Sequence, residues 1–538
     1  CLMKFHTTVK IVLVSSVIFL CTGFALYSFF RLSIASEQNK FNLYTLVPST
    51  ASAVFITEDV NSLISEIENL SCSRDGHYLY FSKIFSSLKR SLHEFTESVP
   101  HGISPQMNQI LLSFHEPINE RNQILYCRLG IGDQDLVDHF IQTHFESAYS
   151  PKIFPYKGKK IYIYSTDKGD FIACYRDKEF LALSYQKRLI EEVIDAQRTG
   201  ESLANDIIFK KVSDIHKNAS SATLYKRMSS KTSWIDLDIK MKGDFIYLSG
   251  TGQETDTCML GHTLRSRTSI EGFVGDALPA TTCYFSRQGV RNWTSFLNYC
   301  CKTDSSTIKC DTIGYDNILS DYLIENACKD LTVCSFYSHD SSPYPATVIR
   351  IPVYDRAESE KRLYSLANSL PLKVNERKST RISWLYFPDR AYPVYSFPSI
   401  KLFTILSSFS TSSPLLYAAF YGDELLLSSS HEELSDYIRY VEKNEVLEHT
   451  LDYNSGIDGL ASSYLLMLMT DLNILSSSPK SLPSFMPKFI FDHVDFFRHF
   501  TLFTQFTSAN EGYHSYIILK YKGKNRDKEK SPEKTNMQ

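Results

Sequence analysis

The sequence has none of the short motifs that mark the commonest nucleotide-binding and hydrolytic sites. It contains no G-x-x-x-x-G-K-[ST] phosphate loop, no G-x-G-x-x-G after a predicted strand and no G-x-S-x-G nucleophile elbow. It also lacks H-E-x-x-H, since His431-Glu432 is followed by Ser435 where the second histidine belongs, and His115-Glu116 runs into Pro117. The sequence therefore contains no motif that would indicate nucleotide hydrolysis or zinc proteolysis.

The sequence also has little net charge and little glycine. Its 57 Lys and Arg residues against 60 Asp and Glu leave a net charge of -3, so no overall field attracts nucleic acid, which we do not expect as a partner. Only 21 residues are Gly, whereas 33 are Tyr and 35 are Phe. This composition favours sheets with aromatic faces over a loop-rich or disordered chain.

The most informative feature is an internal repeat. Residues 47–70 (VPSTASAVFITEDVNSLISEIENL) return as residues 278–300 (LPATTCYFSRQGVRNWTSFLNYC). Residues 171–200 align with 416–445 without a gap, in the same order along the chain. We therefore predict two tandem homologous domains. The first pair of segments shares an apolar helix stripe, in which Val60, Leu63, Ile67 and Leu70 correspond to Val290, Trp293, Leu297 and Cys300.

The predicted fold class is α+β, with two tandem homologous domains of mainly antiparallel sheet and helices after one N-terminal transmembrane helix. Hairpins interrupted by helices favour helices on one face of each sheet. We place repeat one at 42–255, repeat two at 272–523 and a disordered charged tail at 524–538, because the last segment has almost no apolar residue to bury. The junction is expected near 250–267, where TGQETDT is polar and lacks periodicity.

Within the first repeat, alternating and helical periodicities predict individual elements. Predicted strands are 53–57, 110–114, 124–129 and 160–165, with a hairpin at 171–184 turning at 176–178. Predicted helices start at Val60, span 81–95 and 136–144, and carry Leu189, Val193 and Ala196 on one side. A last hairpin buries Ile235, Leu237, Ile239 and Met241, exposes the residues between them, and turns at 242–244 into 245–249. The second repeat is expected to close with strands 498–507 and 513–522 around a turn at 509–512.

The N-terminal region contains a long apolar run. Residues 11–30 (IVLVSSVIFLCTGFALYSFF) are 20 uncharged residues, enough to cross a hydrocarbon core of ~30 Å. Lys4 and Lys10 precede the run, which keeps residues 1–10 in the cytoplasm and sends the bulk of the chain to the periplasm. The length favours an uncleaved anchor in the cytoplasmic (inner) membrane, and a cleaved secretion signal is the alternative.

Six of the twelve cysteines fall between residues 283 and 334. In an oxidising compartment this cluster permits disulfides, with connectivity that the sequence does not fix. The alternative is that Cys283 and Cys300 simply pack, because they align with apolar or small positions of the first repeat. No C-x-x-C pair occurs, so we predict no zinc site.

Three patterns of polar residues were considered as sites, and none of them predicts a catalytic, cofactor-binding or metal residue. Asp452, Asn454, Gly456 and Asp458 alternate as in a calcium loop, but Ile457 and Ser463 occupy the places of the required Gly and Glu, so a polar turn is expected. The other two patterns are read as the solvated side of an amphipathic element and as helix capping. Their members are Asp492, His493, Asp495 and His499, and Asp133, Asp135 and Asp138.

The apolar N-terminal run, the [VL]-P-[SA]-T entry to each repeat and the block YAAFYGDELLL at 417–427 resemble an uncharacterised domain-of-unknown-function family of membrane-anchored envelope proteins from Bacteroidetes. The resemblance extends from about Met3 to Lys524 and implies a tethered, periplasm-facing bacterial protein. Because these motifs are structural, it transfers no functional residue.

The sequence leaves three functions open. A non-catalytic binding or scaffolding module of the cell envelope is favoured, because a duplication comes without a catalytic motif. A hydrolase or transferase with residues such as His493 and His499 from distant loops is the first alternative, and a receptor for a small hydrophobic ligand or lipid is the second. We expect a monomer with an envelope protein or lipid partner and no cofactor.

Overall fold

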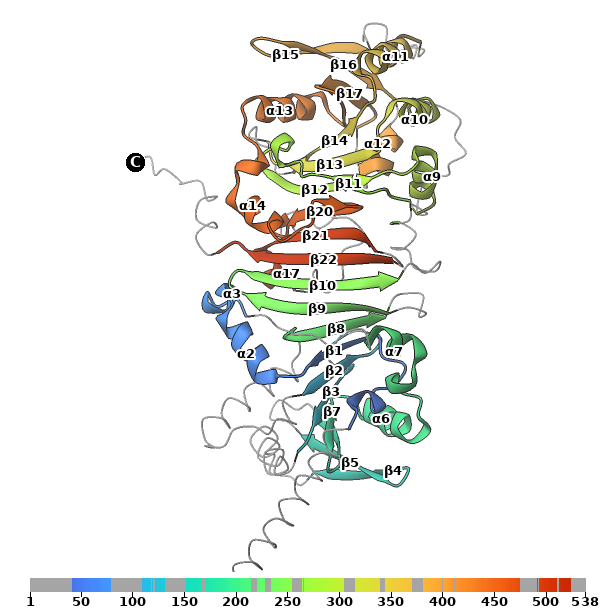
Figure 1. The fold of residues 1–538 in the computed structure, drawn as a ribbon, viewed down its shortest axis with the longest axis vertical. Coiled ribbons are helices and arrows are strands. Elements are labelled where there is room, and N and C mark those ends of the chain that lie inside the picture. The colour runs from blue at the N-terminus through green and yellow to red at the C-terminus, as the bar shows by residue number, and fades with distance from the viewer. Residues whose placement is uncertain are drawn as a thin grey trace, which may run out of the picture. The chain divides into compact units, whose positions relative to one another are not determined.

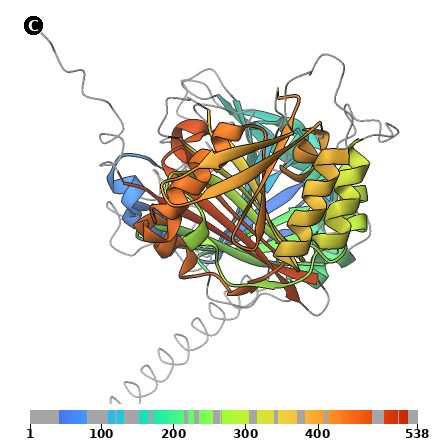
Figure 2. The ribbon, with the colours of Figure 1, turned by 90° about the horizontal axis from the view of Figure 1, so that it is seen from above.

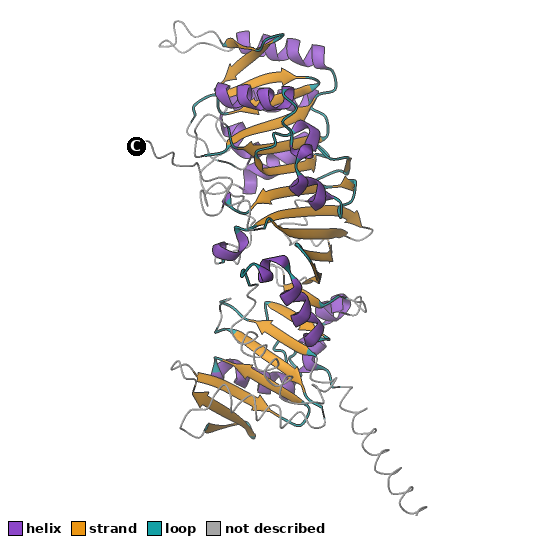
Figure 3. Cartoon of the chain, turned by 90° about the vertical axis from the view of Figure 1, so that its left-hand side faces the viewer, coloured by secondary structure: helices purple, strands orange, loops and turns teal. Residues whose placement is uncertain are grey.

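The fold is described from a computed structural model, which has the mixed α+β architecture expected from the sequence (Figures 1 and 3). The structure describes residues 41–78, 109–117, 119, 121–130, 151–165, 171–213, 220–227, 234–253, 264, 266–303, 315–338, 344–369, 381–398, 400–407, 409, 413–474, 491, 493–509 and 512–523. The predicted anchor at 11–30, the predicted helices at 81–95 and 136–144, and the tail at 524–538 lie outside these residues. No helix among the described residues is long and apolar enough to span a membrane.

The helices are α2 (Val60–Asn69), α3 (Ser71–Arg74), α6 (Lys187–Thr199), α7 (Ile207–Ser213), α9 (Trp293–Thr303), α10 (Tyr315–Asn326), α11 (Arg356–Ser369), α12 (Ile400–Ser407), α13 (His431–Glu442), α14 (Leu451–Ile457) and α17 (Val494–Phe497), with short 3-10 turns η1 (Leu43–Thr45), η2 (Leu203–Asn205), η3 (Gly275–Ala277) and η4 (Leu447–His449). The strands are β1 (Ala53–Thr57), β2 (Ile110–Phe114), β3 (Gln123–Arg128), β4 (Lys152–Tyr156), β5 (Lys159–Ser165), β6 (Phe171–Arg176), β7 (Phe180–Ser184), β8 (Ala222–Arg227), β9 (Trp234–Lys242), β10 (Phe245–Gln253), β11 (Ile270–Glu271), β12 (Thr282–Gly289), β13 (Asp330–Phe336), β14 (Ala346–Pro352), β15 (Ile382–Tyr386), β16 (Ala391–Phe397), β17 (Leu416–Tyr421), β18 (Glu424–Ser428), β19 (Ser463–Tyr464), β20 (Leu466–Asp471), β21 (Phe500–Ala509) and β22 (Gly512–Tyr521).

The chain forms two compact units. The first comprises Cys1–Glu66 and Tyr80–Arg227, and the second comprises Ile67–Leu79 and Met228–Gln538. The boundary near residue 228 differs from the repeat boundary expected at 255, because β9 and β10 belong to the second unit. The end of α2 and the whole of α3 belong to the second unit as well, where Tyr521 donates a hydrogen bond to Asp75.

The sheet of the first unit is antiparallel throughout, in the strand order β8-β1-β2-β3-β7-β6-β5-β4 (Figure 1). The sequence predicted β1 and β2 with their correct ends, and β3, β5 and the β6–β7 hairpin to within about one residue. It did not predict β4, whose residues lack alternation. Helix α6 lies against β3, β5, β6 and β7, and buries the predicted Leu189, Val193 and Ala196.

The sheet of the second unit is also antiparallel, in the order β9-β10-β22-β21-β20-β12-β13-β14-β18-β17-β16-β15 (Figure 1). Strand β10 pairs with β22 over nine residues, from Phe245 opposite Lys520 to Gln253 opposite Gly512. A separate small ladder joins β11 to β19. Two strands about 260 residues apart in the chain thus lie side by side near one end of this sheet.

Helices cover both faces of this sheet, so the expectation of helices on one face is wrong for the second unit. One apolar cluster joins α9, α10, α11 and α12 to the sheet, and another joins α13 and α14 to the opposite face (Figure 2). The reason is visible in β13, whose residues from Leu331 to Phe336 are all buried instead of alternating. A strand buried on both faces has a continuous apolar run, which does not reveal how many layers cover it.

The β9–β10 hairpin confirms the predicted turn and the burial of Leu237, Ile239 and Met241. Three details differ from the prediction. Ile235, expected to be buried, is only partly buried. Asp236, placed on the wet face, is buried and accepts a hydrogen bond from Thr251. The polar junction was expected to begin at residue 250, but β10 continues as a strand to Gln253. Pairing with β22 holds these residues extended despite their polar composition.

Candidate functional site

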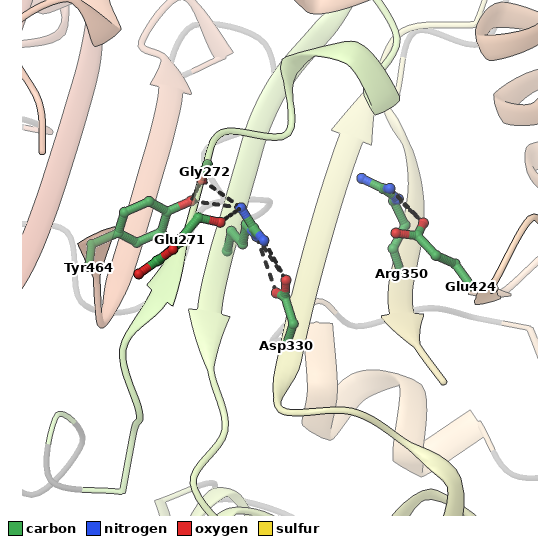
Figure 4. A network of polar contacts seen from close by, with 7 residues as sticks. Glu271, Gly272, Asp330, Arg350, Glu424 and Tyr464 are labelled. Carbon is green, nitrogen blue, oxygen red and sulfur yellow. Dashed lines mark hydrogen bonds and ion pairs between the residues drawn. The ribbon is translucent and has the colours of Figure 1, made fainter. Parts of the chain in front are cut away.

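The most connected polar group in the second unit centres on Arg287 of β12 (Figure 4). Its Nε and Nη2 donate to Asp330 at the start of β13, and its Nη1 donates to the carbonyls of Glu271 and Gly272 and to the Tyr464 hydroxyl. Tyr464 in turn donates to the Gly272 carbonyl at 2.8 Å. Every nitrogen of the guanidinium has an acceptor, so this group ties β11, β12, β13 and β19 together and leaves nothing for a ligand.

A second pair, Arg350 of β14 and Glu424 of β18, is drawn in the same view (Figure 4). The guanidinium Nη2 lies 2.5 Å from the Glu424 carboxylate, and Arg350 is buried. Burial alone would lower the pKa of Arg350, but the nearby Tyr437 and Glu424 raise it instead. Its Nη1 has no hydrogen-bond partner. The pair lies on paired strands inside the sheet and is structural.

The helices α10 and α11 border an open groove of about 670 Å³. Its charges already form ion pairs across the groove: Arg362 binds Glu325 of α10 at 2.9 Å and Glu358 of its own helix at 3.1 Å. The side chains of these groups are half exposed, so the groove has the character of a solvated helix surface.

The best candidate for a site is a smaller cavity of about 200 Å³ in the second unit. It lies where the ends of β12, β20, β21 and β22 meet η4 and α14, and β12 has a bulge between Thr282 and Tyr284 at this place. Bulges are frequent beside functional sites because they redirect side chains. The lining combines hydroxyl, amide, carboxylate, imidazole and ammonium groups; its polar members are Thr281, Thr282, Tyr337, Thr450, Asp452, Asp471, Asn473, His499, Thr501 and Lys522.

The carboxylates of the cavity are each paired with a lysine. Lys522 Nζ lies 2.5 Å from Asp471 Oδ1, and Lys520 Nζ lies 2.8 Å from Asp452 Oδ1 and also contacts Ser455 Oγ. Burial lowers the pKa of Lys520, so its proton is held less tightly than usual. With both carboxylates neutralised by neighbours, the cavity suits an uncharged polar group better than an ion.

His499 is engaged by its neighbours. Its ring stacks on His77 with centroids 3.9 Å apart, and Tyr521 lies 6.1 Å from His77. Arg498 Nε donates to His499 Nε2 at 3.3 Å, so Nε2 acts as an acceptor in this arrangement. The imidazole therefore helps hold the segment after α3 against β21 and β22, besides lining the cavity.

The cavity brings together two of the residues considered from the sequence, Asp452 and His499, and leaves others apart. His493 precedes α17 and Asp495 lies in its first turn, and neither lines the cavity. The polar turn expected at 452–458 is wrong, because residues 451–457 form α14, packed through Gly456 against the Phe503 ring. Asp492, Asp133, Asp135 and Asp138 lie outside the described residues.

Sequence reasoning missed Asp471, Thr281 and Lys522, although one signal pointed nearby. The LPATTC segment, noticed only as a repeat entry, supplies the cavity lining from Ala280 to Cys283. Lys522 and Asp471 are distant in sequence and meet only through the pairing of β20, β21 and β22.

Among the described cysteines, Cys72, Cys328 and Cys334 are free thiols. Cys283 is buried, as the packing alternative expected, and Cys300 is partly buried against the apolar cluster of α9 to α12. Within the same part of the chain, no group of three or more His, Cys, Asp or Glu side chains is placed to hold a metal ion.

The comparisons with known proteins describe a domain but not an activity. Residues 105–240 match the family described as Protein of unknown function (DUF3352), so the chain contains this domain. The match is narrower than the resemblance expected from about Met3 to Lys524. Among solved structures, crystal form I of TP0453 is similar over 43% of this chain and 88% of that chain, with 9% identity and a TM-score of 0.22. No curated protein matches the sequence significantly.

Proposed function

We propose that this protein is a membrane-tethered, extracytoplasmic, non-catalytic binding module of the bacterial cell envelope. The observation that carries the proposal is the outermost strand of the second unit's sheet. On β15, Trp384 is 49% exposed and Tyr386 is 79% exposed, and both point to the same face because strand side chains alternate. Exposed Trp and Tyr are the side chains that most often anchor protein partners.

The free edge of β15 suits such a partner. Among the described strands β15 pairs only with β16, so none of them hydrogen-bonds to its outer edge. Its sequence ISWLY contains neither a proline nor a charge, the usual devices that stop an edge from pairing. A partner strand could add its backbone hydrogen bonds here while its side chains contact the two aromatic rings.

Two tandem homologous halves are part of the proposal, and the strand pairings support them. The order β8-β1-β2-β3-β7-β6-β5-β4 of the first half corresponds to β20-β12-β13-β14-β18-β17-β16-β15 of the second. The hairpins β9–β10 and β21–β22 also correspond. In both halves the entry proline makes an isolated bridge, Pro48 with Ser202 and Pro279 with Val446.

Side-chain contacts refine the proposed alignment. Ser184 lies opposite Ile124 and donates to the carbonyl of residue 123, while Ser428 lies opposite Val348 and donates to that of residue 347. The sequence alignment without a gap had matched Ser184 with Ser429, one residue later. Short apolar repeats tolerate such slips because neighbouring registers look alike in sequence.

The chemistry of the cavity favours binding over catalysis. Asp452 and Asp471 already hold lysines, and the His499 ring is stacked and accepts from Arg498. A general base needs a nucleophile within hydrogen-bond reach. Cys283, the nearest thiol in the lining, instead donates to the Ser335 carbonyl at 3.3 Å.

The tether and the periplasmic location rest on the apolar run at 11–30 and the lysines before it. Membrane fractions from producing cells, washed at high pH and then treated with protease from outside the cytoplasmic membrane, test both. We expect the chain to stay with the pellet and to be digested. A chain released by alkali or protected from the protease would contradict the tether or the location.

The binding role is tested by photo-crosslinking in intact cells. A benzophenone amino acid replaces Trp384 or Tyr386, and the control replaces Tyr354, an equally exposed aromatic residue at 67%. We expect the same discrete adducts from positions 384 and 386 and none from 354. Absence of adducts at both positions, or an identical pattern from 354, would refute the proposed surface.

The second candidate is an envelope hydrolase or transferase acting at the cavity, because Asp452, Asp471 and His499 converge there. Turnover of ester, peptide or glycan substrates by the purified chain would have to be lost in His499→Ala and kept in His449→Ala, an exposed histidine that does not line the cavity. Equal behaviour of the two variants dismisses this candidate. The receptor for a small hydrophobic ligand stays a prediction.

A further inference from the structure

The β4–β5 hairpin forms the end of the first unit's sheet and exposes apolar side chains. Among the described strands β4 pairs only with β5, from Lys152 opposite Ile163 to Tyr156 opposite Lys159. Residues 152–155 are all exposed, with Ile153 at 53% and Phe154 at 40%. Phe171, where β6 begins, is 61% exposed. Ile153 and Phe154 point to opposite faces of the strand, so apolar side chains are exposed on both sides of the β4 edge, and such exposure marks an interaction surface.

The hairpin is also basic. Residues 152–165 contain four lysines and no acidic residue. Two of the lysines are paired with acids from elsewhere: Lys157 lies 2.5 Å from Asp195 and Lys159 lies 3.6 Å from Asp177. Within the described chain no carboxylate is within ion-pair distance of Lys152 or Lys160, both of which are exposed. Among the described residues, Lys152 and Lys160 thus carry charges without an acidic partner beside the exposed Ile153 and Phe154.

A third cation lies at the same surface. The Lys187 ammonium, at the start of α6, is 5.4 Å from the centre of the Phe154 ring. Its side chain is 43% exposed and also contacts Glu191. Phe154 thus sits among ammonium groups while remaining open to solvent.

The outer edge of β4 is poorly suited to pairing with another strand. Pro155 has no backbone N–H and interrupts any ladder, and the adjacent lysines repel a like edge. The edge strand β15, in contrast, has neither device. The exposed apolar residues of β4 therefore suit a surface that is met by side chains alone.

We propose that the β4–β5 hairpin docks on an anionic phospholipid surface. The edge of β4 enters the boundary between headgroups and acyl chains, with Lys152 and Phe154 on one face of the hairpin and Ile153 and Lys160 on the other, so that both lysines contact the phosphates. Docking on an acidic protein instead would give no quenching by brominated lipid in the experiment below. This inference is independent of the partner proposed for β15 and goes beyond it, since it rests on the first unit alone.

The test uses the full chain reconstituted with vesicles and a fluorescent reporter at position 154. Phe154→Trp is combined with Trp384→Phe, which leaves Trp234 and Trp293 as the other tryptophans, both buried. We expect emission from position 154 to be quenched by brominated phosphatidylglycerol and much less by brominated phosphatidylcholine. Quenching that is absent or equal in the two lipids would overturn the proposal.

Charge reversal supplies the matched control. Lys152→Glu with Lys160→Glu should lower the ratio of docked to undocked hairpin by at least about 30-fold, at roughly fivefold for each lysine near an anionic surface. Lys240→Glu with Lys242→Glu changes the net charge equally, at exposed positions of β9 in the second unit, and should leave quenching unchanged. Equal loss in both variants would mean that only the net charge matters, which also overturns the proposal. Circular dichroism checks that each variant is folded.

Discussion

The guanidinium of Arg287 holds the carboxylate of Asp330 through two nitrogens, with Nη2 2.6 Å and Nε 3.0 Å from Oδ2. Their side chains are only 11% and 18% exposed. Burial alone would lower the pKa of Arg287, but the hydrogen bond and charge of Asp330 raise it above the ordinary value. The pair fixes β12 to β13 near the middle of the second unit's sheet, so its loss should lower the free energy of unfolding.

Asp330→Asn keeps the shape of the side chain and removes its charge. The Arg287 charge then stays buried without its counter-ion, so we expect the free energy of unfolding to fall by roughly 3 kcal/mol in urea denaturation. Glu325→Gln breaks the exposed ion pair with Arg362 and should cost less than about 1 kcal/mol. Similar losses in the two variants would contradict a structural role for the buried pair.

Stability should depend on pH through His115 in the first unit. Burial, helped by the charge of Arg188, lowers the pKa of His115 to about 4 from 6.5. Between pH 6.5 and pH 4, His115 therefore binds a proton in the unfolded chain but stays neutral in the folded chain. Stability is full above pH 6.5 and falls by about 3 kcal/mol as the pH drops toward 4.

His115→Asn should flatten this dependence, measured as the slope of unfolding free energy against pH between 6.5 and 4. The variant also loses the contact with Ser113 Oγ at 2.9 Å and has lower stability at every pH, so the slope is the relevant quantity. An unchanged slope would show that other groups cause the acid sensitivity.

Gly250 of β10 lies against the backbone of β9. A Cβ at this position would come 1.7 Å from the Asp236 carbonyl oxygen, so Gly250→Ala forces the two strands apart. We expect a loss of about 3 kcal/mol or more, seen as a lower melting temperature. At Gly459 the nearest atom would be Ile518 Cδ1 at 3.5 Å, an ordinary contact, and Gly459→Ala should change stability by less than about 1 kcal/mol.

Truncating two neighbouring residues of β15 should have very different effects on the free energy of unfolding, because one is buried and the other exposed. Leu385 is 4% exposed and belongs to the apolar cluster beneath α13, so Leu385→Ala should cost about 2–5 kcal/mol. Trp384 points to the other face, and Trp384→Ala should cost less than about 1 kcal/mol in the same denaturation assay. A large loss on truncating Trp384 would mean that its ring is needed for folding and is unavailable to a partner.

Cys334 should resist alkylation in the folded protein. Burial raises the pKa of its thiol to about 12, so almost no thiolate forms at neutral pH. Cys328, which is partly exposed, is the comparison. Peptide mapping after iodoacetamide should find Cys328 modified and Cys334 modified only in urea. Labelling of Cys334 at the rate of Cys328 would contradict its burial.

Much of the local structure could be predicted because it depends on neighbouring residues. The alternation of Leu237, Ile239 and Met241 was sufficient for β9, and the stripe through Leu189 and Val193 was sufficient for α6. The residues after Gly250 were predicted as a linker, because nothing local distinguishes a polar linker from a polar strand that has a partner.

The candidate cavity could not be predicted for the same reason. Asp471 ends β20 and Lys522 directly follows β22, with β21 between these strands, so their contact exists only when all three strands are paired. Asp452 and His499 were noticed in the sequence but for other reasons, a calcium-like spacing and an amphipathic segment. Their shared cavity is a property of the sheet.

The sequence by itself determined the α+β class, the antiparallel hairpins and the positions of β1, β2, β3, β5, β6, β7, β9 and α6, because periodicity and turn residues act over a few positions. Only the tertiary structure decided that β10 pairs with β22 and that helices cover both faces of the second sheet. It also decided that β4 and β15 are edge strands, of which only β4 has a proline and lysines that oppose pairing with a further strand. Those features depend on which distant backbone groups and apolar faces meet, and a one-dimensional pattern of apolar residues is compatible with many such pairings.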